Sequence, residues 1–107
     1  MLENKFQSLV KREFESTGHM VLNLHGHARQ AAGWPDLYVC GPFFRGWLEL
    51  KCRGWLRPLQ VTIVRGLRQR GDEAYALVWE KDRVYLQEWD KTIVKTFPHP
   101  FSAKNWS

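Results

Sequence analysis

Two short apolar runs with a turn-forming connection between them constrain the fold of this chain most. The runs are residues 37–40 (LYVC) and 47–51 (WLELK), and the connection between them reads GPFFRG. Aromatic and branched residues favour strands, whereas glycine and proline favour turns, so the segment predicts an antiparallel β-hairpin. Side chains alternate along a strand. Glu49 and Lys51 therefore share one face, and the leucines on either side of Glu49 point toward the core.

The pairing of the two strands decides whether Asp36 joins that face. Pairing Cys40 with Trp47 places Asp36 opposite Lys51. Directly opposed residues project to the same side with Cβ atoms roughly 5 Å apart, and diagonal neighbours lie about 7–8 Å apart. Asp36 is then diagonal to Glu49, at a separation that suits two carboxylates sharing one metal ion. A slip of one residue would turn Asp36 to the other face.

Each of these motifs is weak by itself. Glu-x-Lys and Pro-Asp both arise by chance in chains of this length, and a strand Glu and Lys commonly form a solvated ion pair. The combination favours a site: Gly-x-Pro-Asp (33–36) opens one strand, Glu-x-Lys (49–51) ends the next, and a helix carrying Gln60 follows. The alternative for Gln60 is an ordinary exposed helix position.

The residue types in this group suit phosphodiester hydrolysis. That reaction needs a cation to neutralise charge on the phosphorus oxygens and a water close to its deprotonated state. Mg²⁺ and Mn²⁺ prefer hard oxygen ligands, and Mg²⁺ commonly takes one or two carboxylates plus waters and substrate phosphate. Asp36 and Glu49 meet that count. Lys51 can orient the water and offset charge, and the Gln60 amide can hold a water or phosphate oxygen.

The order of these motifs resembles the PD-(D/E)xK nuclease superfamily, and within it the small stand-alone VRR-NUC (virus-type replication-repair nuclease) domains. The resemblance spans about residues 3 to 80 and rests on Glu3 with Gln7, 33–36, 49–51, Gly54 and Gln60. Arg57-Pro58 departs from it, because a Ser or Thr cap is expected at the start of the second helix. That departure leaves the helix start open and the metal site untouched.

The resemblance implies a metal-dependent endonuclease acting on DNA. Asp36 and Glu49 would bind Mg²⁺ or Mn²⁺, Lys51 would assist the attacking water, and Glu3 and Gln60 would line the same site, with Glu3 as a further ligand. It also implies a homodimer that favours branched DNA such as four-way (Holliday) junctions, in recombination, repair or phage genome processing. Glu3 has a simpler explanation, since an acidic residue in a first helical turn is a favourable dipole partner.

Periodicity along the chain predicts one α/β domain. The length of 107 residues leaves room for a single modest core. Helices are expected at 3–17 and 58–70, and strands at 19–24, 37–40, 47–51, 73–79 and 83–89. The apolar stripe of the second helix is Leu59, Ile63, Gly66 and Leu67. This αβββαββ order is a mixed sheet flanked by helices, which the resemblance makes restriction-endonuclease-like.

Residues 91–107 follow this core of about 3–90 without a firm period. They form either an arm that packs on the domain or on a second subunit, or a loosely ordered tail.

The net charge of +5 is consistent with a polyanionic partner. Arginines cluster around the candidate site, and the expected DNA-binding residues are Arg29, Arg53, Arg57, Arg65 and Arg68. Trp34 and Trp55 flank the site and either stack on an unpaired base or serve packing. No base-reading helix stands out, so recognition through backbone and shape is expected.

The remaining features exclude other classes of site. Cys40 and Cys52 follow no metal-ligand spacing, and the expected hairpin sets them apart, so reduced cysteines are predicted. His25 and His27 form a His-x-His pair that lacks the further ligands of a structural zinc site. No apolar run approaches a membrane span and no signal peptide is recognisable, which predicts a soluble, cytoplasmic protein without an organic cofactor.

Two other functions remain open at this point. One is a catalytically silent DNA-binding module that keeps a nuclease fold as a scaffold. The other is a nuclease that acts on RNA or within a larger replication complex.

Overall fold

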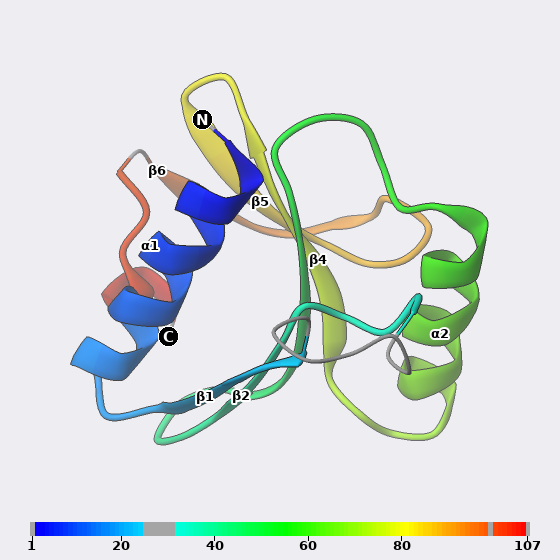
Figure 1. Ribbon diagram of the computed structural model, residues 1–107, viewed down its shortest axis with the longest axis horizontal. Coiled ribbons are helices and arrows are strands. Elements are labelled where there is room, and N and C mark those ends of the chain that lie inside the picture. The colour runs from blue at the N-terminus through cyan, green and yellow to red at the C-terminus, as the bar shows by residue number, and fades with distance from the viewer. Residues whose placement is uncertain (1, 25–31, 99, 107) are drawn as a thin grey trace.

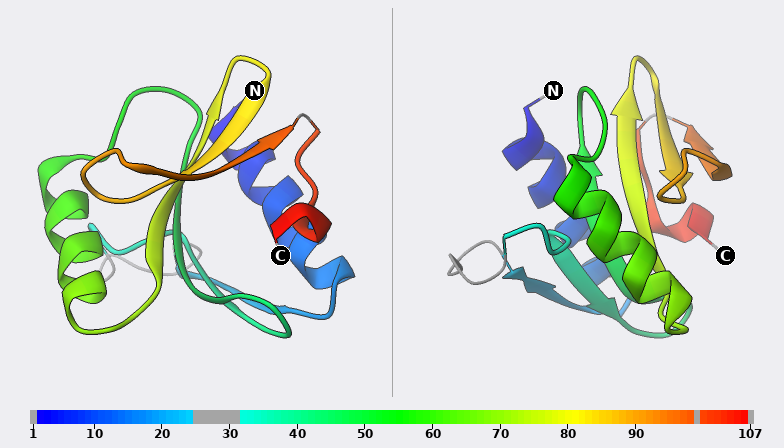
Figure 2. Two further views of the ribbon diagram at one scale, coloured as in Figure 1. Left: turned by 180° about the vertical axis from the view of Figure 1, so that it is seen from behind. Right: turned by 90° about the vertical axis from the view of Figure 1, so that its right-hand side faces the viewer.

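A six-stranded mixed sheet carries a helix on each face (Figure 1). The computed structural model describes residues 2–24, 32–98 and 100–106. The elements in chain order are α1 (Glu3–Ser16), β1 (Met20–Asn23), β2 (Leu37–Cys40), β3 (Arg45–Lys51), α2 (Pro58–Gln69), β4 (Ala74–Glu80), β5 (Arg83–Gln87), β6 (Ile93–Pro98) and the 3₁₀ helix η3 (Ala103–Trp106). Figure 2 shows α1 and η3 together on one face and α2 on the other.

The strands follow chain order across the sheet, from β1 at one edge to β6 at the other. Neighbouring strands are antiparallel except β3 and β4, which are parallel and connected through α2. A parallel pair requires a crossover of this kind, because a short turn can join only antiparallel strands. The expected α/β class with two helices around a mixed sheet is confirmed, with both helices beginning where expected.

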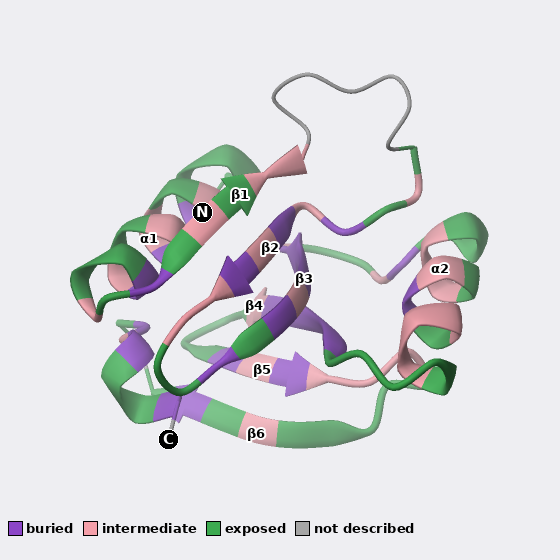
Figure 3. Cartoon of the chain, turned by 90° about the horizontal axis from the view of Figure 1, so that it is seen from below, coloured by how far each residue is buried: buried purple, intermediate pink, exposed green. Residues whose placement is uncertain are grey.

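The sheet has one strand more than the sequence predicts. Ile93–Pro98 forms β6 along the outer side of β5, so the order is αβββαβββ. Figure 3 shows β6 exposed along most of its length, and Phe97 is its buried residue. A strand with so few buried positions has no clear apolar alternation, which is why its sequence shows no period.

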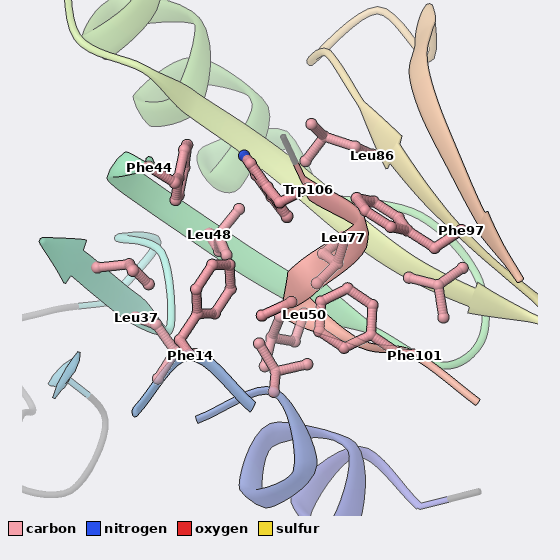
Figure 4. Packing of buried hydrophobic residues seen from close by; sticks show 14 of the residues in the cluster. Phe14, Leu37, Phe44, Leu48, Leu50, Leu77, Leu86, Phe97, Phe101 and Trp106 are labelled. Carbon is pink, nitrogen blue, oxygen red and sulfur yellow. The ribbon is translucent and has the colours of Figure 1, made fainter. Parts of the chain in front are cut away.

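Aromatic side chains dominate the core between the sheet and α1 (Figure 4). Phe14 lies at its centre and contacts the rings of Phe44, Phe101 and Trp106. We call this the α1-side core; its members are Phe6, Val10, Phe14, Leu37, Val39, Phe44, Leu48, Leu50, Tyr75, Leu77, Val84, Leu86, Phe97, Phe101, Ala103 and Trp106. The C-terminal residues in this set make the end of the chain an arm that packs on its own domain.

Smaller residues form the α2-side core on the opposite face: Leu56, Val64, Ala74, Ala76 and Val78. The helix meets the sheet through Val64, with Val61 and Leu67 packed beside it. The predicted stripe was therefore rotated from the observed one, and Leu59 is 54% exposed. The cause is that α2 is apolar on two adjacent faces, and a periodic pattern alone does not say which face meets the sheet.

The hairpin register differs from the expected one by two residues. Cys40 pairs with Arg45 and Tyr38 with Trp47. Gly46 is expected in the turn from the sequence, but in the structure it is a residue of β3. A Cβ on Gly46 would lie 2.6 Å from the Glu73 carbonyl oxygen, so glycine serves here to let the chain before β4 approach β3.

No helix within the described ranges is long and apolar enough to cross a membrane.

Candidate active site

Asp36 and Glu49 lie on the same face of the sheet, across from one another. Continuing the observed pairing one residue beyond Leu37 and Leu48 brings Asp36 directly opposite Glu49. The two-residue shift preserved the face, because side chains alternate with a period of two. The Leu50 N–H donates to Asp36 Oδ2 at 2.8 Å and fixes that carboxylate against β3. The pair is thus closer than the diagonal separation expected from the sequence.

Glu49 is a buried acid in the middle of the sheet. Its exposed fraction is 3%, and its strand neighbour in β4 is Ala76. The small alanine leaves the α2 side of the sheet open enough to hold a carboxylate beside the helix. Glu49 Oε1 is buried and has no hydrogen-bond donor among the described residues. Burial of a carboxylate without full hydrogen bonding is costly, so this group requires another explanation.

Lys51 and Gln60 both approach the other oxygen of Glu49. Lys51 Nζ lies 3.8 Å from Glu49 Oε2, and Gln60 Nε2 donates to the same oxygen at 3.2 Å. Lys51 is itself buried, with 8% exposed. The alternative of a solvated strand pair is therefore excluded for Glu49 and Lys51, and the alternative of an unengaged helix position is excluded for Gln60.

Gln60 also begins the helix that carries it. Its Oε1 accepts the Arg57 N–H at 2.8 Å, which is the N3 half of a capping box, and Pro58 occupies the first helical position. The missing Ser or Thr cap is thus replaced by Gln60. Because the Gln60 Oε1 accepts from the start of the helix, its Nε2 is oriented toward Glu49.

The site has an excess of negative charge around Glu49. Burial and, to a smaller extent, the charge of Asp36 and a hydrogen bond with it raise the pKa of Glu49 to about 8, against the opposing effect of Lys51. Glu3 adds a smaller contribution in the same direction as Asp36. A carboxyl group in this state becomes an effective ligand when a cation joins it, because the cation favours the ionised form.

Glu3 lies close enough to Glu49 for its charge to act on that carboxyl group. It lines a cleft at the N-terminus of α1 together with Lys5, Cys52 and Arg53. Cys52 directly follows Lys51, so the cleft opens beside the end of β3. The sequence does not identify Lys5 as a residue of this cleft, although it lies two positions from Glu3. A helical pattern does not show which residues face the end of a neighbouring strand.

A divalent cation fits the donor set of this site. Within the described ranges, no three His, Cys, Asp or Glu side chains gather into a complete protein cage for a metal. A Mg²⁺ site does not need such a cage, since one or two carboxylates with waters and phosphate suffice. Asp36 and Glu49, whose Oε1 has no hydrogen-bond donor among the described residues, are the residues that would hold it.

The expected DNA-binding arginines differ in exposure and in their contacts. Arg53 and Arg57 are exposed near the site. Arg68 forms ion pairs with Glu73 at 2.7 Å and Glu88 at 2.8 Å, so its guanidinium ties α2 to the strands. Arg65 stacks on Trp89, with Cζ 4.8 Å from the ring centroid.

Trp34 and Trp55, the tryptophans expected to flank the site, also differ in exposure. Trp55 packs against the α2-side core, with the Lys91 ammonium 5.7 Å from its ring centroid, whereas Trp34 is 37% exposed beside Trp47. Arg29, His25 and His27 lie outside the described residues.

Comparison with protein-family models, with curated proteins and with solved structures gave no match.

Proposed function

We propose that this protein is a metal-dependent nuclease that hydrolyses phosphodiester bonds in DNA. The observation that carries the proposal is the buried Glu49, which faces Asp36 across two strands and has Lys51 and Gln60 at its second oxygen. Buried charge that adds nothing to packing is concentrated at functional sites. A mixed sheet with Glu49 on β3, Asp36 directly before β2 and helices on both faces supports a restriction-endonuclease-like fold.

Each residue has a role that follows from its position. Asp36 and Glu49 hold Mg²⁺ or Mn²⁺, which when bound supplies charge neutralisation and an activated water. The Lys51 ammonium donates to the water or to the phosphate oxygens as negative charge develops. Gln60 keeps Glu49 oriented, and Glu3 adds negative charge at the edge of the site. Arg53 and Arg57, both exposed, track the phosphate backbone.

The proposed substrate is branched DNA and the proposed assembly is a homodimer. Both follow from the resemblance to stand-alone VRR-NUC domains. A symmetric pair of sites is suited to a substrate that has two equivalent strands to cut.

The test is cleavage by the purified protein. Labelled four-way junction, flap, duplex, single-stranded DNA and RNA are incubated with Mg²⁺, with Mn²⁺ or with chelator. Asp36→Asn and Lys51→Met remove one charge each and keep the side-chain size. We expect metal-dependent cutting of DNA and a loss of at least about 100-fold in each variant, since each removes a group that acts on the reacting phosphate.

Asp82→Asn is the matched control, because it makes the same chemical change at an exposed turn between β4 and β5. It should cut as the parent does. Cutting that survives Asp36→Asn and Lys51→Met would contradict the proposed site. Binding of DNA without cutting under any metal would make the protein a silent DNA-binding module, and preferential cutting of RNA would change the substrate.

A further inference from the structure

An apolar cleft lies between α2 and the segment that leads into β2. In Figure 1 this segment reaches across to α2 before it turns into the strand. The cleft has a volume of about 240 Å³ and is lined by Trp34, Thr62, Ile63, Gly66, Leu67 and Arg70. One water occupies about 30 Å³ of liquid, so the cleft has room for a flat organic ring. Gly66 contributes no side chain, which keeps the helix side of the cleft open.

Trp34 is held in a fixed position at this cleft. Gly33 has a φ of 81°, and a Cβ at that position would lie 2.5 Å from Leu59 Cγ. Only glycine permits this close approach of the segment to α2. Trp34 meets Trp47 with ring centroids 5.5 Å apart, and Trp47 Nε1 donates to Asp72 Oδ2 at 3.3 Å. The exposed part of the Trp34 ring is therefore presented by a rigid support.

The cleft lies close to the carboxylates. Trp34 precedes Asp36 by two residues, so their Cα atoms are at most about 7 Å apart. Along α2, the residues from Ile63 to Gly66 lie roughly 5 to 9 Å beyond Gln60, the helix residue that contacts Glu49. Stacked bases in a strand are about 3.4 Å apart. A base in the cleft would thus belong to a nucleotide within one or two positions of a phosphate at Asp36 and Glu49.

The charge at the cleft suits a nucleotide. Among the described residues that line it, Arg70 carries the one charge and none is a carboxylate; Arg70 is exposed, and its Nη1 donates to the Gly66 carbonyl oxygen at 3.0 Å. An apolar slot beside an aromatic ring, with a guanidinium at the rim, offers stacking to a base and attraction to its phosphate. On the α2 side the cleft is lined by Ile63, Gly66 and Leu67, next to the face through which Val64 and Leu67 pack in the α2-side core.

We propose that this cleft binds one unpaired base of the DNA substrate by stacking on Trp34. The inference rests on the proposed nuclease function and adds a source of substrate selection to it. Bases inside a fully paired duplex are not accessible for such stacking, whereas single strands and branch points expose them. Trp34 is a specificity residue in this scheme, and the carboxylates remain responsible for the chemistry.

The test measures binding in chelator, so that it does not depend on cutting. The probes are a single-stranded DNA containing 2-aminopurine, the same DNA in a perfect duplex, and the same duplex with one unpaired 2-aminopurine. We expect quenching of the 2-aminopurine fluorescence with the unpaired probes. Trp34→Ala should weaken their binding by about 5-fold to 100-fold, the loss expected for one stacked base, and should leave duplex binding unchanged. Trp34→Phe should restore most of the affinity.

Phe43→Ala is the matched control, since Phe43 is also 37% exposed but lies in the turn between β2 and β3. It should leave all probes unaffected. Arg70→Gln should weaken binding of the unpaired and paired probes alike and reduce the salt dependence, as loss of a phosphate contact does. An RNA strand of the same sequence shows whether the cleft distinguishes the sugar.

Equal loss of paired and unpaired binding in Trp34→Ala would overturn the inference, and so would no loss at all. A change from dimer to monomer in that variant, with base selectivity intact, would make the cleft a protein interface and also overturn it. The proposed function fails separately: if the parent protein cuts no DNA with any metal while Trp34→Ala loses only binding of the unpaired probes, the base site stands without the nuclease.

Discussion

The two faces of the sheet differ in the side chains that they bury. The α1-side core is large and aromatic, with Phe6, Val10 and Phe14 of the helix fully buried. The α2-side core consists of small residues, and the ionisable side chains of Glu49 and Lys51 are buried on that face. A well-packed apolar face can supply the stability of a small domain. The other face can then hold buried charges that cost stability and carry chemistry.

The largest expected effect is on the aromatic face. Phe14→Ala removes a fully buried ring that contacts Phe44, Phe101 and Trp106. We expect a loss of about 3–5 kcal/mol in the free energy of unfolding, measured by denaturant titration. Phe43→Ala, at a partly exposed ring, should cost less than about 1 kcal/mol. A small loss in Phe14→Ala would mean that stability does not reside mainly on this face.

The second prediction concerns the cost of the charges on the α2 face. Burial raises the pKa of Glu49 to about 8, so the folded protein binds a proton more tightly than the unfolded chain does. The associated stability is complete below the unfolded pKa and is lost as the pH rises through the folded pKa. Without metal, the free energy of unfolding should fall by a few kcal/mol between about pH 5 and pH 9, since one pKa unit is about 1.4 kcal/mol.

Glu49→Gln should remove most of this pH dependence, because the amide does not titrate. Mn²⁺ should stabilise the parent protein most at high pH, where Glu49 is ionised, and should stabilise Glu49→Gln little. Unfolding curves at several pH values, with chelator and with Mn²⁺, measure both effects. Parallel pH profiles of parent and variant would show that Glu49 is not the buried acid responsible.

A third and smaller effect is expected at Gln60, which connects α2 to the site. Gln60→Ala removes the acceptor for the Arg57 N–H and the donor to Glu49, and should cost about 1 kcal/mol. Gln60→Glu keeps the acceptor and loses the donor. If Gln60 orients Glu49, both variants should lower kcat in the cleavage assay, while only Gln60→Ala loses the cap. Equal kcat in parent and variants would limit Gln60 to capping.

The residues of the candidate site could be predicted from the sequence, but their exact geometry could not. Asp36, Glu49 and Lys51 share a face in any register that differs by two residues, so the error in the register did not separate them. The register itself depends on the length of the turn. Gly46 is a glycine because of the backbone of Glu73, a contact between residues distant in the chain. Local patterns contain no information about such contacts.

The missed parts of the fold have the same cause. The α2 stripe was rotated because the helix meets two partners, the sheet through Val64 and the 33–34 segment through Ile63. β6 has one buried residue, Phe97, and therefore no alternation to detect. In both cases the sequence contains the apolar residues, but the neighbour that each one meets is set by tertiary packing.

The smallest expected effect comes from a buried titratable group on the aromatic face, and it has the opposite sign to that of Glu49. His19 is 4% exposed and lies between the rings of Phe14 and Phe43, and its Nε2 has no hydrogen-bond partner among the described residues. Burial lowers the pKa of His19, while hydrogen bonds to the Phe14 and Thr17 backbone partly oppose the shift. The unfolded chain therefore takes up a proton more readily.

Stability from His19 is complete above its unfolded pKa and is lost as the pH falls through the folded pKa. His19→Phe keeps an aromatic ring in the same space and should lose less stability than the parent on acidification from about pH 7 to pH 5. Comparing the two curves cancels the carboxyl groups common to both. Glu49→Gln should then flatten the alkaline side, His19→Phe the acid side, and the double variant both. A double variant that keeps either slope would mean that a group elsewhere in the chain causes it.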